Sequence, residues 1–379
     1  MRARLSADFE RFRRELPRDF ADHVRQAYGV NLATHYLGMP LPHPIGKGSG
    51  QLSLNADQLE TDCVAGLAYV VLKTVIAEDP SGARAMDAWA IHETRMRVEP
   101  RRARDGREGW TVTWKGRGWD RDLAAYCELV RSGRRIMDEH GMLVVPSVKY
   151  HLPRVDEPFR DAEYVHTTAE LARAWGAGPL LVEQDFSPTL AGDALGDERA
   201  RILRWIAEVP ARVRAAAPGG ARVSLKLMNA RFDDDFQVAM LEAAARSADA
   251  AVAFNRLFDA ELGAAYGGWD LSDRNFRALA LARGRGVSLP PLAGSGNVCS
   301  GHLLLEYARL GCASVQLHTF FQLPLGAYPA TAGSRTQRAL HALVFHPIDG
   351  LVAGLLDRAD QGQLERRGGE LHFLDVVGA

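Results

Sequence analysis

The chain has 379 residues, of which 47% are hydrophobic and 25% charged, with a formal net charge of −1. This length suffices for one large α/β barrel or for two average domains. The near-neutral charge gives no electrostatic reason to expect a nucleic-acid partner. No apolar run is long enough to span a membrane, and the first residues lack the apolar core of a secretory signal. We therefore expect a cytoplasmic, globular protein.

Cysteine and histidine spacing gives no sign of a metal centre. The four cysteines form no CxxC pair, so we expect free thiols in a reducing compartment and no iron–sulfur cluster. The histidines form no ligand pattern, and no metal site is predicted. Lysine is rare beside arginine, which makes a lysine at a strand end informative. The five lysines are Lys47, Lys73, Lys115, Lys149 and Lys226.

Residues 7–28 have apolar side chains at spacings of three and four, which predicts an amphipathic helix. Pro17 falls inside this pattern and indicates a kink or two short helices. We expect residues 1–30 to be an N-terminal helical extension that packs on the following domain. A helix that lies on a membrane surface or binds a partner is the alternative.

Short apolar runs alternate with helix-like segments from residue 31 onward, and several of these segments close with glycine. Continuous apolar strands that alternate with helices indicate a parallel sheet. Eight such units predict an α/β fold of the (β/α)8, or TIM-barrel, type over residues 31–332. A doubly wound sheet is the alternative, but no GxGxxG follows a first strand. The runs are 43–48, 68–75, 142–149, 179–186, 222–229, 250–257, 288–295 and 313–320.

Two segments depart from this alternation. Residues 84–120 contain "GWTVTWKGRGW", whose alternating apolar and polar residues predict a β-hairpin, which we expect to be inserted over the barrel mouth. Residues 333–379 contain "LHALVFHPIDGLVAGLLDRA", which predicts closing helices and a tail.

Functional residues of such a barrel come from the carboxyl ends of its strands and from the loops that follow them. Four of the five lysines fall at these positions, which predicts a cationic mouth suited to an anionic or electron-rich ligand; they are Lys47, Lys73, Lys149 and Lys226. The run "PLAGSGNV" places glycines between a strand and a helix, and the hydroxyl of Thr319 follows the next strand. Backbone N–H groups at such glycines can bind a phosphate.

Five stretches, in order and at compatible spacing, resemble the dihydroorotate dehydrogenases and the related domain of dihydropyrimidine dehydrogenase. They lie between about Asn31 and about Gln322 and are "LGMPLPHPIGKGSG…GLAYVVLKTV", "VSLKLMNA", "VAFNRLF", "YGGWDLS" and "PLAGSGNVCSGHLLLEYARLGCASVQLHTFF". Members of this family are FMN-dependent (β/α)8 barrels. The resemblance therefore implies an FMN cofactor and an oxidoreductase that acts on CH–CH bonds.

The resemblance also assigns roles to single residues. The flavin contacts that it implies are Gly48, Ser49, Lys73, Thr74, Lys226 and Asn255. Lys73 would lie near the N1/C2=O edge, where a cation stabilises the negative charge of the reduced ring. Asn255 would hydrogen-bond flavin or substrate. The phosphate cradle would consist of Gly268, Gly294, Gly296, Asn297 and Thr319.

The family places a catalytic Cys or Ser directly before a proline in the loop after strand four, and Ser187 occupies that position here. It would take a proton from the substrate while hydride passes to flavin N5, and Lys73 is the other residue expected to be catalytic. A serine is a weak base and needs help from a neighbour that the sequence does not show. The residues expected to bind substrate are Gln184, Thr189 and Arg256.

The departures from the family concern substrate binding. Gln184 and Thr189 stand where the family has asparagines that hold the orotate ring, and its Asn-rich motif after strand two is not found between residues 78 and 120. A pocket that pairs with its substrate by hydrogen bonds rejects analogues strongly, so these losses favour a substrate other than dihydroorotate.

We therefore predict hydride transfer between flavin N5 and a C–C bond beside a carbonyl in a small cyclic substrate. The electron acceptor is unknown, a homodimer is left open, and no nucleic-acid or membrane partner is expected. Two alternatives remain. One is a flavin-free (β/α)8 lyase or aldolase with Lys226 as Schiff base, and the other is a non-catalytic barrel that serves as a binding or scaffold subunit.

Overall fold

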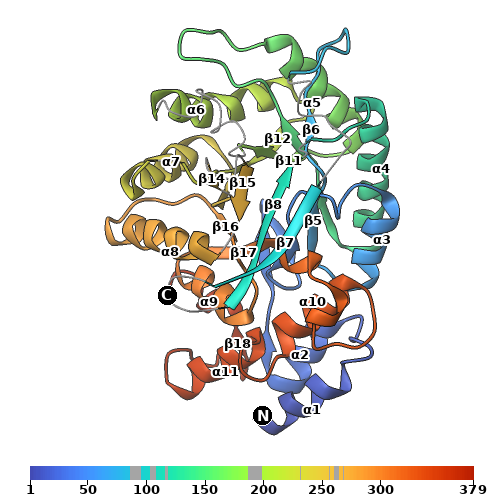
Figure 1. Ribbon diagram of the computed structural model, residues 1–379, viewed down its shortest axis with the longest axis vertical. Helices are drawn as coiled ribbons and strands as arrows, with labels where there is room; N and C mark the ends of the chain where they lie inside the picture. Colours follow the sequence, from blue (N-terminus) through green and yellow to red (C-terminus); the bar gives the residue numbers. More distant parts are fainter. Residues whose placement is uncertain are drawn as a thin grey trace.

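The central sheet of the computed structural model has ten parallel strands in the order β6-β10-β11-β12-β13-β16-β17-β4-β5-β9 (Figure 1). The structure describes residues 1–85, 95–102, 108–115, 118–186, 199–230, 232–255, 257–259, 264–267 and 269–379. The strands of this sheet are β4 (Ile45–Lys47), β5 (Tyr69–Val71), β6 (Val75–Ile76), β9 (Leu143–Val145), β10 (Ser147–Lys149), β11 (Leu180–Asp185), β12 (Ala221–Lys226), β13 (Ala250–Ala253), β16 (Leu292–Ser295) and β17 (Cys312–Leu317).

Every strand of this sheet lies within or overlaps an apolar run predicted from the sequence. Two runs are each divided into two strands: three residues separate β5 from β6, and Pro146 separates β9 from β10. The two divided runs are neighbours in the sheet along their whole length: their first strands, β5 and β9, pair with each other, and so do their second strands, β6 and β10. The protein therefore has an α/β fold with a curled parallel sheet, as predicted in outline.

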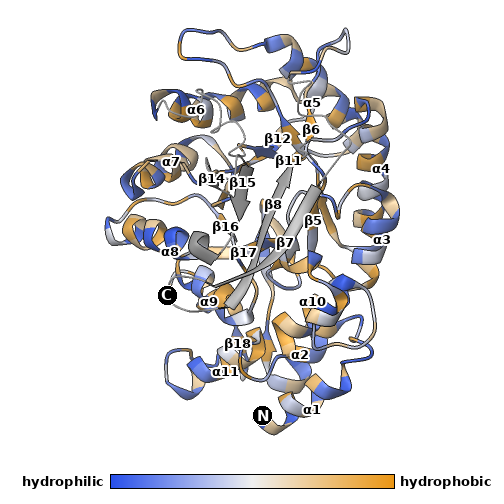
Figure 2. Cartoon of the chain, viewed as in Figure 1, coloured by the Kyte–Doolittle hydropathy of each residue, from blue (hydrophilic) through white to orange (hydrophobic). Residues whose placement is uncertain are grey.

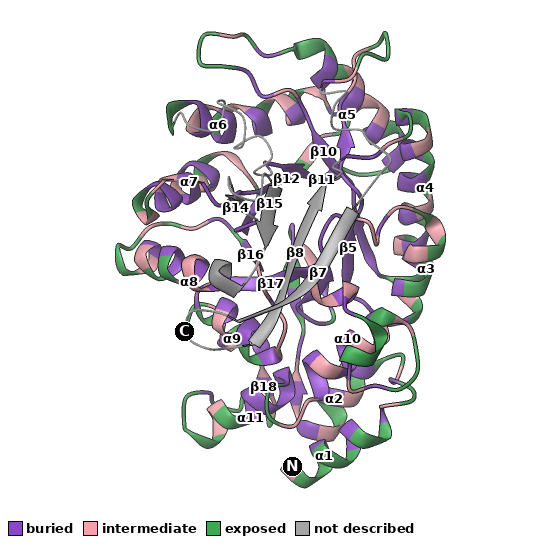
Figure 3. Cartoon of the chain, viewed as in Figure 1, coloured by how far each residue is buried: buried purple, intermediate pink, exposed green. Residues whose placement is uncertain are grey.

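Helices cover the outside of this sheet, and Figure 2 shows their apolar residues in stripes rather than all around. All residues of β11 and β17 are buried, as expected of parallel strands that are covered on both faces (Figure 3). Asn55, Asp122, Asp233 and Ser300 cap four helices by accepting a hydrogen bond from a backbone N–H of the first turn. The helices are α3 (Ala56–Val64), α4 (Leu123–His140), α5 (Asp161–Trp175), α6 (Arg199–Ala216), α7 (Asp234–Ser247), α8 (Trp269–Gly284) and α9 (Gly301–Arg309).

The two ends of the chain pack together. Residues 1–30 form two short helices, α1 (Arg2–Arg11) and α2 (Phe20–Tyr28), with Pro17 between them, as one of the predicted alternatives has it. They meet α10 (Arg335–Phe345), where the ring of Phe9 stacks on His341 at 4.5 Å. β1 (Val30–Asn31) pairs with β18 (Leu371–His372), and α11 (Leu351–Asp360) lies between α10 and β18 in sequence. In the described parts of the chain, every helix is too short or too polar to cross a bilayer.

A small hairpin of β2 (Thr34–Tyr36) and β3 (Met39–Leu41) lies near the amino end of β17, because the Thr34 hydroxyl donates to the carbonyl of Ala313. Its two-residue turn has positive φ at Leu37 (51°) and Gly38 (72°), as hairpin turns of this length favour. The hairpin places Tyr36, 2% exposed, inside the sheet, where its ring stacks on Tyr69 at 4.8 Å. The remaining short helices are η3 (Phe320–Gln322), η4 (Leu325–Ala327) and η5 (Phe373–Asp375).

A second, antiparallel sheet contains the predicted hairpin. β7 (Arg95–Arg102) pairs with β8 (Glu108–Lys115), and β8 continues to β15 (Ala264–Gly267) and β14 (Leu257–Asp259). The hairpin follows β6 in the chain and the β14–β15 segment follows β13, so both enter this sheet from carboxyl ends of central strands (Figure 1). Sequence analysis found the hairpin but not the two strands that extend it.

Candidate functional site

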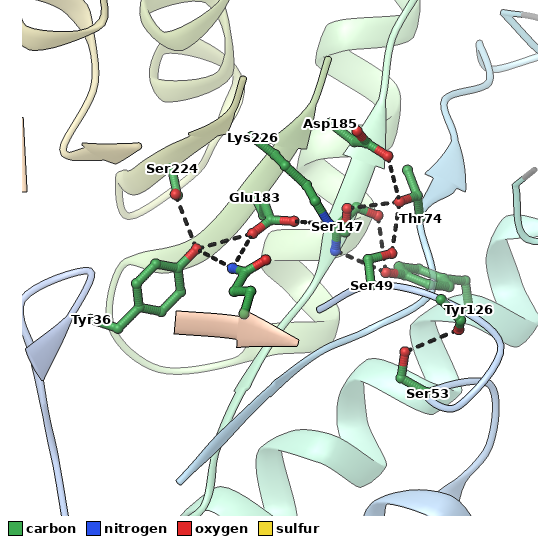
Figure 4. Close-up of polar contacts among 12 residues, drawn as sticks. Tyr36, Ser49, Ser53, Thr74, Tyr126, Ser147, Glu183, Asp185, Ser224 and Lys226 are labelled. Atoms are coloured by element: carbon green, nitrogen blue, oxygen red, sulfur yellow. Dashed lines mark hydrogen bonds and ion pairs between the residues drawn. The ribbon is translucent and has the colours of Figure 1, made fainter. Parts of the chain in front are cut away.

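Four strand ends bring three hydroxyls and one carboxylate together (Figure 4). The Oγ1 atom of Thr74 lies 2.8 Å from Ser49 Oγ and 3.0 Å from Ser147 Oγ, and it donates to Asp185 Oδ2 at 3.2 Å. A hydroxyl has one proton, so while Thr74 donates to Asp185 it accepts from the two serines. All four side chains are buried. We call Ser49, Thr74, Ser147 and Asp185 the hydroxyl cluster.

A second group of polar side chains lies beside the hydroxyl cluster, around Glu183. Glu183 Oε2 accepts from Gln316 Nε2 at 2.6 Å and from the Tyr36 hydroxyl at 3.1 Å. The same tyrosine hydroxyl lies 3.0 Å from Ser224 Oγ. Buried polar groups need such partners, since an unpaired one costs the free energy of its lost hydration. Lys226, whose Nζ lies 3.6 Å from Glu183 Oε1, completes this group.

The charge of Glu183 is set by opposing effects. Complete burial raises the pKa of this carboxyl, because desolvation penalises the charged form, and the positive charge of Lys226 opposes the rise. The hydrogen bond from Gln316 also favours the carboxylate, whereas the negative charge of Asp185 disfavours it. Glu183 and Lys226 are 0% and 4% exposed, so the pair is shielded from water.

Strand alternation decides which residues of "LLVEQD" face this site. Successive side chains of a strand point to opposite faces, and Glu183 and Asp185 both make contacts on the inner face. Gln184 therefore lies on the other face of β11. Within the described residues, its side-chain nitrogen and oxygen are both buried without a hydrogen-bond partner. Its expected contact with substrate stays a prediction that this orientation does not favour.

The lysines do not all line the mouth, and the expectation for Lys47 is wrong. Its ammonium donates to Asp62 on α3 and to Thr336 on α10, at 3.1 Å for the threonine. The reason is again alternation, because Gly46 and Gly48 take the inner positions of this segment. A Cβ added to Gly48 would lie 3.7 Å from Lys226 Nζ. The other three expected lysines are buried, at 4% exposure for Lys73, 2% for Lys149 and 4% for Lys226.

Amide side chains form a third group, from the segments after β12 and β13 and from α8. Asn229 Nδ2 donates to the backbone oxygen of Asn255 at 2.7 Å and to Asn275 Oδ1 at 3.0 Å. Asn275 Nδ2 donates to the backbone oxygen of Ser295 at 2.7 Å. In the described chain, Asn255 Nδ2 is buried and has no hydrogen-bond partner, although the residue is 7% exposed. This orphan donor lies at the carboxyl end of β13, where a ligand atom could accept from it.

The glycine loop after β16 has the conformation that close backbone approach requires. Gly296 has φ +103°, and a Cβ there would lie 2.7 Å from Asn275 Nδ2. At Gly294 a Cβ would strike the ring of Tyr307, so neither position accepts a side chain without displacement. Asn297 follows with φ +52°. Thr319 lies just beyond the neighbouring strand β17, where it precedes η3.

Four expected site residues lie outside the described residues: Ser187, Thr189, Arg256 and Gly268. In the parts of the chain that are described, no group of three or more His, Cys, Asp or Glu side chains could hold a metal ion. The sequence analysis missed Tyr36, Ser147, Glu183, Asp185 and Gln316. Alternation along "LLVEQD" was the available signal for the two acids, whereas Tyr36 and Gln316 required the fold.

Comparison with known proteins adds no family assignment. The sequence matches no protein-family model and no curated protein. What the site can do must therefore be argued from its own chemistry.

Proposed function

We propose that this protein is an FMN-dependent oxidoreductase of the dihydroorotate-dehydrogenase-like group, built on a (β/α)8 barrel. The barrel is inferred from the sheet order. Because β5 and β6 come from one run and β9 and β10 from another, the ten strands correspond to eight positions, and the β5–β9 and β6–β10 pairs join the two ends of the strand order.

The observation that carries the proposal is the convergence of residues that the family resemblance assigns to one flavin ring. Ser49 and Thr74 are in hydrogen-bond contact. Gly48, which precedes Ser49, lies against Lys226, whose ammonium would be 3.7 Å from an added Cβ. These residues come from three separate strand ends. The fold brings strand ends together, and the resemblance is what identifies these particular residues with a flavin site.

The residues present fit an FMN. Asn255 offers a buried amide donor without a protein partner in the described chain, and the flavin ring edge has acceptors that could use it. Gly294 and Gly296 accept no side chain without displacement and Asn297 follows them, while Thr319 follows the neighbouring strand β17; backbone N–H groups of such a glycine loop could bind the phosphate. Lys226 and Lys73 would supply the cations near the ring.

Bound FMN would supply a hydride acceptor for the oxidation of a C–C bond beside a carbonyl. The chain must then accept the proton that leaves the neighbouring carbon. Ser187, the expected base, follows Asp185 by two residues, and the Asp185 carboxylate is the group that could help it, because a carboxylate accepts a proton where a serine hydroxyl does so poorly. The hydroxyl cluster orients this carboxylate through Thr74.

The Asp185 carboxylate also indicates which hydrogen-bonding groups the substrate would carry. An amide both donates and accepts hydrogen bonds, whereas a carboxylate only accepts, so Asp185 favours a substrate group that carries a hydrogen-bond donor. Dihydroorotate itself carries N–H donors, so the case for another small cyclic substrate rests on the departures at Gln184 and Thr189. The Schiff-base alternative gains no support from the contacts of Lys226, whose Nζ lies 3.6 Å from the Glu183 carboxylate.

Reconstitution with FMN tests the proposal. Purified protein should bind FMN with flavin absorbance near 450 nm, and one member of a panel of cyclic carbonyl compounds, beginning with dihydroorotate and dihydrouracil, should bleach it anaerobically. Protein that stays colourless with added FMN would refute the function. Bound flavin that no compound reduces would favour the non-catalytic alternative.

A further inference from the structure

One oxygen of the Glu183 carboxylate accepts hydrogen bonds that fix the group, and the other oxygen faces Lys226 (Figure 4). Its Oε2 receives two hydrogen bonds, from Gln316 Nε2 on β17 and from the hydroxyl of Tyr36 in the β2–β3 hairpin. Among the described residues, its Oε1 has no hydrogen-bond partner, and it lies 3.6 Å from Lys226 Nζ. Two fixed donors therefore orient the group, and its second oxygen is presented to a cation.

Burial of these two charged groups costs free energy unless they attract each other at close range. A buried carboxylate and a buried ammonium each lose several kcal/mol of hydration in round terms, which their mutual attraction recovers only in good geometry. A well-packed apolar pair would often be as stable. The ammonium of Lys226 is the end of a long, flexible side chain, so it takes a defined position only where a partner holds it.

We propose that Glu183 is a positioning residue that fixes the place of the Lys226 ammonium at the flavin site. Tyr36 and Gln316 fix Glu183 in turn. The inference rests on the proposed function, because it assigns Lys226 to a flavin ring. It makes the electrostatics of the site depend on a tyrosine from the far, amino-terminal end of the sheet.

The reduction potential of bound FMN tests this without any substrate. Glu183→Gln keeps the size of the side chain and removes one negative charge beside Lys226. Without that carboxylate the ammonium loses its fixed position and stabilises the reduced, negatively charged ring less. We expect a tenfold smaller preference for reduced over oxidised FMN, a fall of about 30 mV for this two-electron couple. A potential equal to or above that of the wild type would overturn the inference.

Two further variants separate positioning from general damage. In a Lys226→Gln background, Glu183→Gln should no longer shift the potential, because Glu183 acts through Lys226. A shift of the same size in that background would contradict this. Glu163→Gln is the matched control. Glu163 is also a buried glutamate (3% exposed), but it lies on the outside of the sheet, where it accepts a hydrogen bond from the backbone N–H of His151. This variant should leave the potential unchanged.

The result remains decisive if Glu183→Gln does not fold. Glu183→Asp keeps the charge but withdraws it from Lys226, and it should lower the potential by a smaller amount; an unchanged potential would overturn the inference. Failure of the proposed function has a different signature. Wild-type protein would then bind no FMN, whereas failure of this inference alone leaves wild type and variant with bound FMN of equal potential.

Discussion

Thr74 donates a hydrogen bond to the Asp185 carboxylate across 3.2 Å, although 111 residues separate the two in sequence. Both lie at carboxyl ends of parallel strands, which a curled sheet brings to one edge. The hydroxyls of Ser49 and Ser147 are both within hydrogen-bond distance of the Thr74 hydroxyl oxygen. Because Thr74 donates its proton to Asp185, it must accept from the two serines, so Asp185 sets the direction of all three hydrogen bonds. A single acidic group thus organises the part of the site that the resemblance assigns to flavin and substrate.

Replacing Asp185 should affect chemistry more than cofactor binding. Asp185→Asn removes the proton acceptor but keeps the shape of the side chain. We expect FMN to bind normally and its reduction by an active substrate to slow by about 100-fold or more, the usual size of a general-base effect. Stopped-flow measurement of flavin bleaching checks this. Asp185→Glu should recover part of the rate, and an unchanged rate in Asp185→Asn would remove Asp185 from the reaction.

Lys47 should matter for stability rather than for the flavin. Lys47→Met leaves the Asp62 carboxylate buried at 1% exposure without its cation. Loss of one partner of a buried ion pair costs about 3–5 kcal/mol, so the free energy of unfolding should fall by that order. Urea denaturation measures it. Lys47→Met with Asp62→Asn should recover much of the loss, while the spectrum of bound FMN stays that of the wild type in both.

Gly296 should be required for the phosphate loop because of what surrounds it. Gly296→Ala places a Cβ 2.7 Å from Asn275 Nδ2 at φ +103° and should weaken FMN binding as measured by fluorescence titration. Gly286→Ala is the matched control, with φ +66° and no atom within 4 Å of the added Cβ. Equal FMN affinities in the two variants would show that the loop does not approach the cofactor.

His43 should make the fold acid-sensitive. Burial lowers the pKa of this histidine from 6.5 to about 4, because desolvation penalises the charged ring, and the hydrogen bond to the carbonyl of Gly66 opposes only part of that shift. The unfolded chain binds a proton in this window that the folded chain does not, so stability falls as pH drops from about 6.5 to about 4.

The contribution of His43 should amount to about 3 kcal/mol over that window, at 1.36 kcal/mol per unit. His43→Gln cannot take up the proton. The difference in unfolding free energy between wild type and variant should therefore shrink as pH falls. A difference that is the same at pH 7 and at pH 4 would contradict the assignment.

The sheet was predictable because its strands are continuously apolar and separated by capped helices. The period of the pattern also predicted the β7–β8 hairpin, and Pro17 indicated the kink or break between the first two helices. The pairing of that hairpin with β15 could not be predicted, since "YGGWDLS" has the composition of a turn and its strand partner lies about 150 residues earlier in the chain.

The sequence predicted which residues lie at the strand ends better than it predicted which way their side chains point. Ser49, Thr74 and Lys226 follow from strand ends, and the structure brings them to one region. Lys47 shows the limit, because a one-residue difference in a three-residue strand turns a side chain to the other face. Tyr36 could not be found at all from local sequence, since it reaches Glu183 from a hairpin at the other end of the sheet.

The central claim is that FMN binds at the carboxyl ends of the strands, against Lys226. The most direct measurement is titration of the purified, flavin-free protein with FMN, followed by flavin fluorescence and absorbance, for the wild type and for Lys226→Gln. We expect one FMN bound per chain in the wild type and a more negative reduction potential for the FMN bound to the variant. Absence of saturable binding to the wild type, or equal potentials in both proteins, would contradict it.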